Sequence, residues 1–316
     1  MVNRWYFRKE ELQNTPSISK HRYTVEQERL ERGKGCNFIL QVGIPLHLPQ
    51  MTLATATVFL HRFYMRYSLK EYHCYEIGAT CLFLATKVEE TGRKTRDFVI
   101  SCVRVAQKNP TLEVTDESTE YWRWKEVIAY TEELVLESVC FDLTITHPYD
   151  IVIKYVKELN VPKEVARSAW AFLNDSVRTM LCVMYRPNTV AAAAFYFASK
   201  HTSIPVDYQG NQKWWEVMAA DLDDIREACH VMADLYESLP IKNVEQKYIA
   251  SPRPPNQDNS DMNKRPRTVE NNDISHYNGI SNGRDVANHR SSRDRISRSN
   301  TLVLPDKDEE KSEGEL

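Results

Sequence analysis

The chain has 316 residues, of which 42% are hydrophobic, and a formal net charge of −3. This length allows two domains and a tail, and the hydrophobic fraction is sufficient for two buried cores. The nearly balanced charge argues against a dedicated nucleic-acid-binding protein, because such domains carry a strongly basic face. No apolar run reaches membrane-spanning length, so we expect no membrane association.

Seven cysteines are present, and none of them forms a Cys-x-x-Cys pair. Most lie in apolar helical patterns, where a free thiol behaves as a small hydrophobic group. An odd number of cysteines without a signal peptide favours a reducing compartment. We therefore expect no metal site.

The N-terminal segment, residues 1–23, begins with the aromatic run Trp5-Tyr6-Phe7. Three neighbouring aromatic side chains are not left in water, so they pack on the chain's own domain or on a partner. Packing on the own domain is the more frequent outcome. We interpret these residues as a short docking segment in front of the first domain.

The first domain, predicted over residues 24–146, has the apolar periodicity of helices. Its centre is the run at residues 78–90, which is apolar on every side until its charged end and therefore predicts a helix buried all round. Helices are predicted, in chain order, at 24–42, 52–67, 78–90, 94–107 and 122–141. An extended link follows at residues 142–149.

The central run recurs later in the chain. Residues 192–200 repeat the pattern of residues 79–87, and a lysine closes each copy. Two copies of one central helix predict two similar all-helical domains in tandem, the second over residues 147–240. The helices of the second domain are predicted at 149–159, 162–184, 187–201, 211–219 and 221–238.

From residue 251 onward, Pro, Asn, Ser, Asp and Arg dominate and aromatic residues nearly vanish. Such a segment buries too little apolar surface to offset the entropy of ordering it, so residues 241–316 are predicted to be a disordered tail. The tail contains a basic cluster typical of nuclear import, Lys264, Arg265 and Arg267, and a small Arg/Ser tract. The alternative for both is a solvated tail without a dedicated role.

The sequence lacks the motifs of catalytic sites. It contains no Gly-rich phosphate-binding loop, no Gly-x-Ser-x-Gly nucleophile elbow and no His-Glu-x-x-His zinc motif. The histidines show no metal-ligand spacing, and the paired acids lie at predicted helix ends, where solvated surface is the ordinary role. We therefore predict a binding module without a cofactor rather than an enzyme.

Several short strings, taken in order, resemble the transcription group of the cyclin family, which includes cyclins K and T. They are Trp5-Tyr6-Phe7, Thr15-Pro16-Ser17, His-Arg-Phe-Tyr-Met at 61–65, Leu-Phe-Leu-Ala-Thr-Lys-Val-Glu-Glu at 82–90, Phe-Asp-Leu at 141–143 with His-Pro-Tyr at 147–149, and Lys-Trp-Trp-Glu at 213–216. Together they span nearly all of residues 5–240. The resemblance implies an all-α fold of two tandem five-helix cyclin boxes, in agreement with the internal repeat.

The resemblance also implies a kinase-binding site. Lys87 matches the cyclin-box lysine and Glu132 the glutamate of the fifth helix, which in the family hydrogen-bond and charge-pair with the kinase around its regulatory αC helix. Leu136, Phe141 and Leu143 match the apolar residues that pack on that helix. Glu132 and Leu136 are four residues apart and share one helix face. The alternatives are that Lys87 only closes its own helix and that Leu136 is ordinary core.

The implied function is that of a regulatory subunit that binds and activates a cyclin-dependent kinase. The implied substrate is the C-terminal repeat domain of RNA polymerase II, the implied process is transcription elongation, and the implied location is the nucleus. Two alternatives stay open: a DNA-bound basal transcription factor with a cyclin fold, similar to TFIIB, and a splicing-linked cyclin. The first would need a zinc ribbon and a basic face, which the sequence does not show, and the Arg/Ser tract that would favour the second is brief. We expect no direct contact with nucleic acid.

Overall fold

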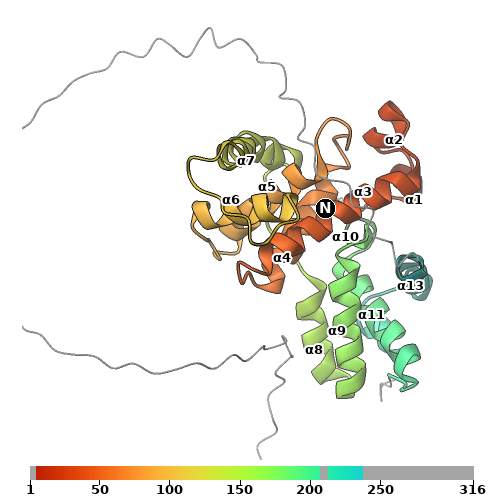
Figure 1. The fold of residues 1–316 in the computed structure, drawn as a ribbon. Coiled ribbons are helices and arrows are strands. Elements are labelled where there is room, and N and C mark those ends of the chain that lie inside the picture. The colour runs from red at the N-terminus through yellow and green to blue at the C-terminus, as the bar shows by residue number, and fades with distance from the viewer. Residues whose placement is uncertain (1–4, 207–212, 238–316) are drawn as a thin grey trace, which may run out of the picture. The chain divides into compact units, whose positions relative to one another are not determined.

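A computed structural model describes residues 5–206 and 213–237, which form helices and connecting loops without a strand (Figure 1). The predicted all-α fold class is confirmed for this part of the chain. The predicted tail, residues 241–316, lies outside the described residues, and so do Lys264, Arg265 and Arg267. No helix within the described ranges is long and apolar enough to cross a membrane.

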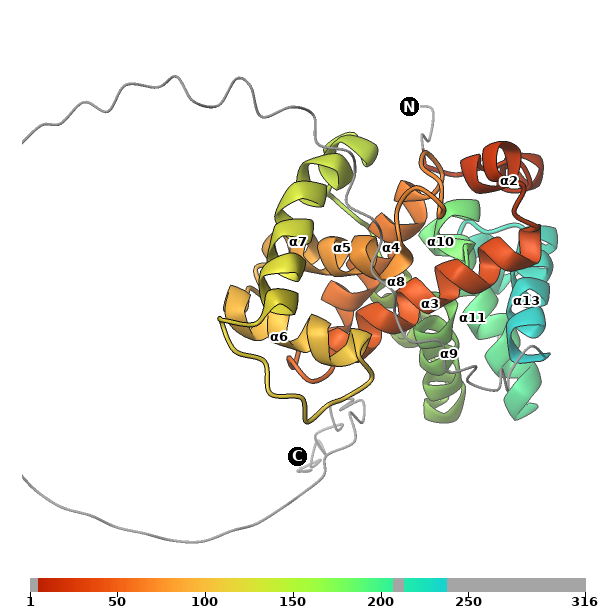
Figure 2. The same ribbon diagram turned by 45° about the horizontal axis from the view of Figure 1, so that its top comes forward.

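Seven helices make up the N-terminal half of the described chain. They are α1 (Lys9–Leu12), α2 (Pro16–His21), α3 (Val25–Gly43), α4 (Gln50–Phe63), α5 (Cys74–Val88), α6 (Thr95–Ala106) and α7 (Thr119–Ser138). α3 starts at a capping box, in which Thr24 and Gln27 exchange side-chain to backbone hydrogen bonds. Helices α3 to α7 form the first bundle, with α5 at its centre (Figure 2).

The central helix α5 is buried on nearly all sides. The side chains of Ala79, Thr80 and Leu82 are fully buried, and α5 packs on α3, α4 and α7. It approaches α3 closely at Gly78, where an added Cβ atom would lie 3.3 Å from the carbonyl oxygen of Gly35. The two helices can approach this closely because neither position carries a side chain.

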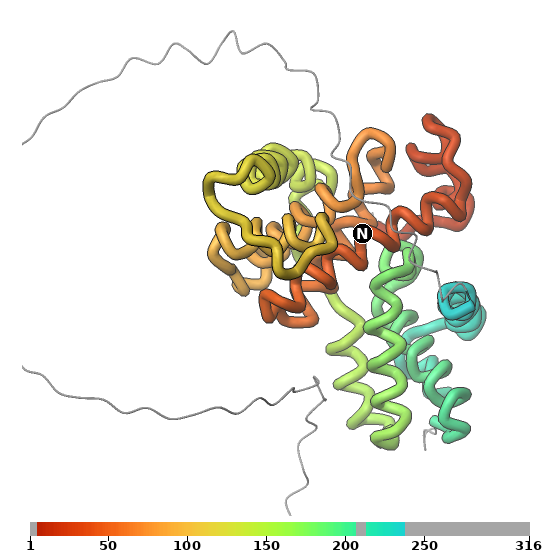
Figure 3. The backbone as a smooth tube through the Cα atoms, viewed as in Figure 1, coloured from red at the N-terminus to blue at the C-terminus, as the bar shows by residue number. Residues whose placement is uncertain are grey.

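The second bundle repeats this layout. Its helices are α8 (Pro148–Glu158), α9 (Lys163–Ser176), α10 (Leu181–Met184), α11 (Pro187–Thr202), α12 (Trp214–Val217) and α13 (Leu222–Glu237). α11 is buried at each of its four consecutive alanines, residues 191–194, and packs on α8, α9 and α13 (Figure 3). α5 and α11 thus occupy equivalent places in two bundles, which is the tandem arrangement that the repeat predicted.

Two predicted helices are much shorter in the structure. The helix predicted at residues 162–184 ends at Ser176, and α10 follows as a separate turn. The side-chain oxygens of Ser176 and Thr179 each donate to a backbone carbonyl three residues earlier, and such bonds compete with the helical backbone. The helix predicted at residues 211–219 is only the four-residue α12 within the described part, and Ala219 after it adopts a left-handed backbone with φ 54°.

The link between α7 and α8 is held from several sides. Trp5, which is 4% exposed, donates its indole N–H to the Asp142 carboxylate over 2.7 Å, and the Arg62 guanidinium lies 4.5 Å from its ring centre. The ring Nε2 of His147 and the hydroxyl of Thr55 on α4 hydrogen-bond at 2.8 Å. The prediction that the N-terminal aromatic run packs on its own chain is therefore confirmed for Trp5.

Candidate functional site

The packing of α5 on α7 brings Lys87 and Glu132 together. Lys87 lies in the last turn of α5, and its Nζ is 2.5 Å from Oε1 of Glu132. The Lys87 side chain is 50% exposed and that of Glu132 is 21% exposed. The contact that positions them includes a hydrogen bond of 2.6 Å between the hydroxyls of Thr80 and Thr131. In the free chain each charge is therefore the other's partner, and half of the lysine remains open to solvent.

An aromatic ring that the sequence analysis did not single out lies beside the lysine. Phe83 is half-buried one turn before Lys87, and its ring centre is 4.5 Å from the Lys87 Nζ. A cation at this distance from a ring face is attracted by it. Phe83 itself packs edge-on against Phe98 of α6, with 5.2 Å between ring centres. The four-residue spacing of Phe83 and Lys87 is the signal by which the sequence could have predicted this contact.

α7 turns one face inward and leaves the neighbouring face partly open. Trp124, Ile128 and Val135 are buried in the first core. Leu136 lies one turn after Glu132, is half-buried and packs against the same core. Leu136 therefore contributes to the core, as the alternative proposed, and also keeps part of its side chain accessible beside the charged pair.

Phe141 projects into solvent just after α7. Its side chain is 65% exposed, and both Phe141 and Cys140 have a φ of 54°. This left-handed region is costly for residues with a side chain. The turn is closed by a hydrogen bond of 3.0 Å from the Phe141 N–H to the Leu136 carbonyl. Strained backbone that exposes a large ring recurs at binding sites, because the surrounding fold must hold it in place.

Leu143 completes the set of five predicted residues. It is half-buried and packs against the first core, two residues after the exposed Phe141. The five predicted residues are therefore a charged pair and three apolar side chains that range from half-buried to exposed. This combination of residue types is chemically suited to an amphipathic helix of a partner.

The described residues contain no cluster of side chains that could bind a metal ion. Within residues 5–206 and 213–237, no group of three or more His, Cys, Asp or Glu side chains is arranged to hold a metal ion. The seven cysteines are free thiols, and four of them are buried. Burial raises the pKa of the Cys182 thiol to about 12 and that of Cys229 to about 11, so at neutral pH both are present as thiols.

Two family models together match most of the chain. The model of the cyclin N-terminal domain matches residues 4–144, and the model of the cyclin-T2-like C-terminal domain matches residues 147–232. Cyclin pch1 of Schizosaccharomyces pombe is 45% identical over 241 residues, which cover 75% of this chain and 70% of that protein.

Other relatives are more distant and longer. Cyclin-K of Homo sapiens is 34% identical over 242 residues, which cover 73% of this chain and 40% of that protein. Cyclin-T1-4 of Arabidopsis thaliana is 33% identical over 239 residues, which cover 75% of this chain and 44% of that protein. The chain thus matches less than half the length of these two relatives.

Solved structures share the fold at low sequence identity. A chain of the yeast RNA Pol II CTD kinase CTDK-1 complex aligns with a TM-score of 0.61 and 21% identity, over 75% of this chain and 74% of that chain. A chain of the CAK complex from Chaetomium thermophilum aligns with a TM-score of 0.57 and 18% identity, over 73% of this chain and 76% of that chain. At this level of identity the likeness concerns the fold.

Proposed function

This chain belongs to the cyclin family, in its transcription-type branch, and from that premise we propose that it binds and activates a cyclin-dependent kinase. The kinase phosphorylates the C-terminal repeat domain of RNA polymerase II and acts in the nucleus in transcription elongation. The chain supplies no catalytic group of its own. Support comes from the cyclin-K and cyclin-T relatives and from the fold shared with a chain of an RNA Pol II CTD kinase complex.

The proposed mechanism is positional. A protein kinase is active when the lysine of its β3 strand pairs with the glutamate of its αC helix. A cyclin that binds αC in its inward position better than in its outward position shifts this two-state element toward the active form. In this proposal residues 24–146 and 147–240 are the two cyclin boxes, and residues 1–23 are a docking segment that steadies them.

The single observation that carries the proposal is the exposed Phe141, whose backbone N–H is bonded to the carbonyl of Leu136, one turn after Glu132. A side chain of this size that is 65% exposed, on a backbone with φ 54°, is unfavourable in the free chain. A kinase αC helix would cover the ring together with the accessible parts of Leu136 and Leu143. Lys87 and Glu132 would lie at the rim of that contact and align the helix by charge.

Reconstitution from purified components tests the proposal. The chain is mixed with kinase subunits of the transcription group, and phosphorylation of a polymerase repeat peptide is measured. We expect at least one kinase subunit to be inactive alone and active with the chain. The proposal is refuted if none of them gains activity, or if the purified chain phosphorylates the peptide after stringent removal of copurifying kinase.

A further inference from the structure

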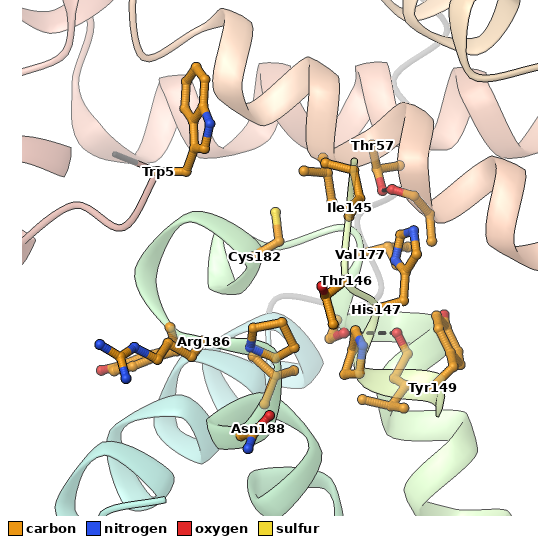
Figure 4. A pocket seen from close by; sticks show the side chains of 18 of the residues that line it. Trp5, Thr57, Ile145, Thr146, His147, Tyr149, Val177, Cys182, Arg186 and Asn188 are labelled. Carbon is orange, nitrogen blue, oxygen red and sulfur yellow. Dashed lines mark hydrogen bonds between the residues drawn. The ribbon is translucent and has the colours of Figure 1, made fainter. Parts of the chain in front are cut away.

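A cavity of about 540 Å³ lies between the two bundles, and none of the five residues proposed to bind the kinase lines it. Its walls come from the N-terminal segment, from α4, from the link before α8 and from the start of α11 (Figure 4). A volume of this size is in the range of ligand-binding pockets. Trp5, Ile145 and Val177 give it apolar walls. The charged residues of its lining are Arg62, Arg186 and Asp142.

Two helices begin at this cavity without a side-chain cap. α8 starts after His147 and α11 starts after Arg186; each has a proline in its first turn, and neither N-cap side chain hydrogen-bonds to the helix. In Figure 4, His147 and Tyr149 at the start of α8 and Arg186 and Asn188 at the start of α11 border the same space. Uncapped helix N-termini carry partial positive charge and free N–H groups, which favour anions.

A buried guanidinium adds a full positive charge to the same wall. Arg62 is 8% exposed, and its Nη1 donates to the backbone carbonyl of Asp142 over 3.2 Å. The guanidinium also lies 4.5 Å from the ring centre of Trp5. Its Nε has no hydrogen-bond partner among the described residues, and Arg62 forms no ion pair there. Burial lowers the pKa of this guanidinium, with nearby Cys182, Asp142 and Tyr6 opposing the shift. A buried cation without an ion-paired carboxylate is a site where an anion would be stabilised.

The neighbouring charges leave the cavity positive. Arg186 is exposed at its mouth, and the charges of Arg62 and Arg186 both act on the hydroxyl of Tyr6, whose pKa is raised chiefly by burial. The carboxylate in the wall belongs to Asp142, and its Oδ2 accepts the hydrogen bond from Trp5. Among the lining residues, two guanidiniums therefore face one carboxylate that is already engaged. α8 carries Asp150 in its first turn, so the start of α11, which has no acidic residue there, is the less compensated of the two helix N-termini.

We propose that this cavity binds a phosphoserine side chain in a segment of the polymerase repeat domain that is already phosphorylated. The ligand class follows from charge, because a phosphate carries nearly two negative charges and three acceptor oxygens, and so matches two guanidiniums and free N–H groups better than a carboxylate does. The apolar walls at Trp5, Ile145 and Val177 accept the uncharged residues beside the phosphate. The assignment of the segment to the kinase substrate rests on the proposed function.

Such a site would give the kinase a second hold on its substrate. A repeat array bound at the cavity through one phosphorylated repeat keeps unphosphorylated repeats at high effective concentration near the kinase active site. Substrate that has been phosphorylated once is then phosphorylated again more readily. The cavity thereby favours processive modification of one polymerase tail.

Binding of a fluorescent repeat peptide to the chain alone tests the proposal. We expect the phosphoserine form to bind more tightly than the unphosphorylated form, with an affinity that falls as salt is added. Arg186→Glu should weaken binding of the phosphorylated form by about tenfold or more, the loss expected for one charge-assisted hydrogen bond. The variant should still fold, because Arg186 is exposed and an acidic residue is favourable at a helix N-terminus.

Arg167→Glu is the matched control, because Arg167 is an exposed arginine on α9 that does not line the cavity. It should bind the phosphorylated peptide like the unchanged chain. Equal binding of the two peptide forms, or equal affinities of the Arg186→Glu and Arg167→Glu variants, would overturn the proposal. Because no kinase is present, this failure is distinct from a failure of kinase activation.

A second readout uses the assembled kinase. Arg186→Glu should raise the KM for a repeat peptide that already carries phosphoserine and leave the KM for the unphosphorylated peptide unchanged. A parallel rise for both peptides would assign Arg186 a general structural role and would contradict the proposed site.

Discussion

The two bundles share one layout and differ at the ends of their central helices. α5 ends beside Lys87, whose charge meets the Glu132 carboxylate at 2.5 Å. α11 carries Lys200 in its last turn, and the Nζ of Lys200 lies 5.7 Å from the ring centre of Tyr196. Both central helices thus carry a lysine in the last turn. Within the described residues, only the lysine of the first bundle, Lys87, is paired with a carboxylate.

This difference distinguishes residues that the fold needs for packing from residues that are available to bind a partner. The small, buried residues of α5 and α11 serve the same packing role, since each central helix must be approached closely by its neighbours. The charged pair and the exposed Phe141 contribute little to either core. Residues that are present in one copy of a repeat and are not needed for packing are candidates for a functional role.

Removal of Lys87 or Glu132 has the largest expected effect. If the kinase desolvates this pair, Lys87→Ala or Glu132→Ala leaves a charge unpartnered at a cost on the order of 2–5 kcal/mol. Kinase affinity should then fall by roughly 30-fold or more. The double variant should lose less than the sum of the single losses, because the two side chains contact each other. Affinity and peptide phosphorylation are the measurements.

Lys200→Ala is the control that the second bundle supplies. It should leave kinase affinity and activation nearly unchanged, with thermal melting showing that all variants fold. If Lys200→Ala were as damaging as Lys87→Ala, the distinction between the two bundles would fail. If Lys87→Ala activated the kinase like the unchanged chain, the predicted site would lie elsewhere.

Phe141→Gly should change stability and binding in opposite directions. Glycine adopts positive φ without strain, so the free chain should become more stable by about 1 kcal/mol. Loss of an anchoring ring should weaken kinase binding by about tenfold or more. Tyr130→Ala is the matched control, because Tyr130 is also 65% exposed but lies on another face of α7 than Glu132. Equal losses of kinase affinity for the two variants would remove Phe141 from the site.

His61 tests the contact between the bundles through pH. Its Nε2 lies 3.2 Å from the Val177 carbonyl oxygen, and burial lowers the pKa of His61 to about 3. The folded chain therefore holds the imidazole neutral. Its contribution is complete above the unfolded pKa of about 6.5 and is lost as the pH falls from there toward about 3, by up to about 1.4 kcal/mol per pH unit.

The measurement is the free energy of unfolding at pH 7.5 and at pH 5.5. The unchanged chain should lose about 1 kcal/mol more than His61→Gln over this interval, because glutamine does not titrate. The other buried histidines titrate in both proteins, so their effect cancels in the difference. The same pH slope in both proteins would show that His61 is not held neutral by the fold.

Gly78→Ala has the smallest expected effect. It tests whether α5 tolerates the alanine that α11 carries at the equivalent position. The repeat places Ala191 where the first bundle has Gly78. The added Cβ would lie 3.3 Å from the Gly35 carbonyl oxygen, an overpacking that typically costs about 1–3 kcal/mol. Alanine's better helix propensity offsets about 1 kcal/mol of this. We expect a net loss of about 1 kcal/mol in chemical denaturation, and a more stable variant would show that α3 can move.

The sequence predicted those parts of the fold that depend on long apolar patterns. α5 is buried on nearly all sides, as its composition indicated, and the repeat predicted the two bundles. The end of α9 at Ser176 was not predicted, because it depends on which backbone carbonyl each nearby hydroxyl contacts. Such choices depend on the local three-dimensional geometry and leave no periodic signal.

The candidate site was predictable in its residues but not in its geometry. Lys87 and Glu132 were identified by resemblance to a family, and their direct pairing depends on the packing of α5 against α7. The left-handed backbone at Phe141 was not predictable from composition, since no glycine or asparagine marks it. The cavity between the bundles likewise depends on tertiary structure, because its positive wall combines Arg62 with the starts of two later helices.

Photo-crosslinking from position 141 tests the central claim most directly. A benzophenone amino acid replaces Phe141 in the complex with an activated kinase, and cross-linked peptides are identified by mass spectrometry. The same probe at Tyr196, near the end of α11, serves as the comparison. We predict cross-links from position 141 to the kinase αC helix and none to that helix from position 196. Cross-links from position 196 to αC, or none from position 141, would contradict the assignment of the kinase-binding surface to the first bundle.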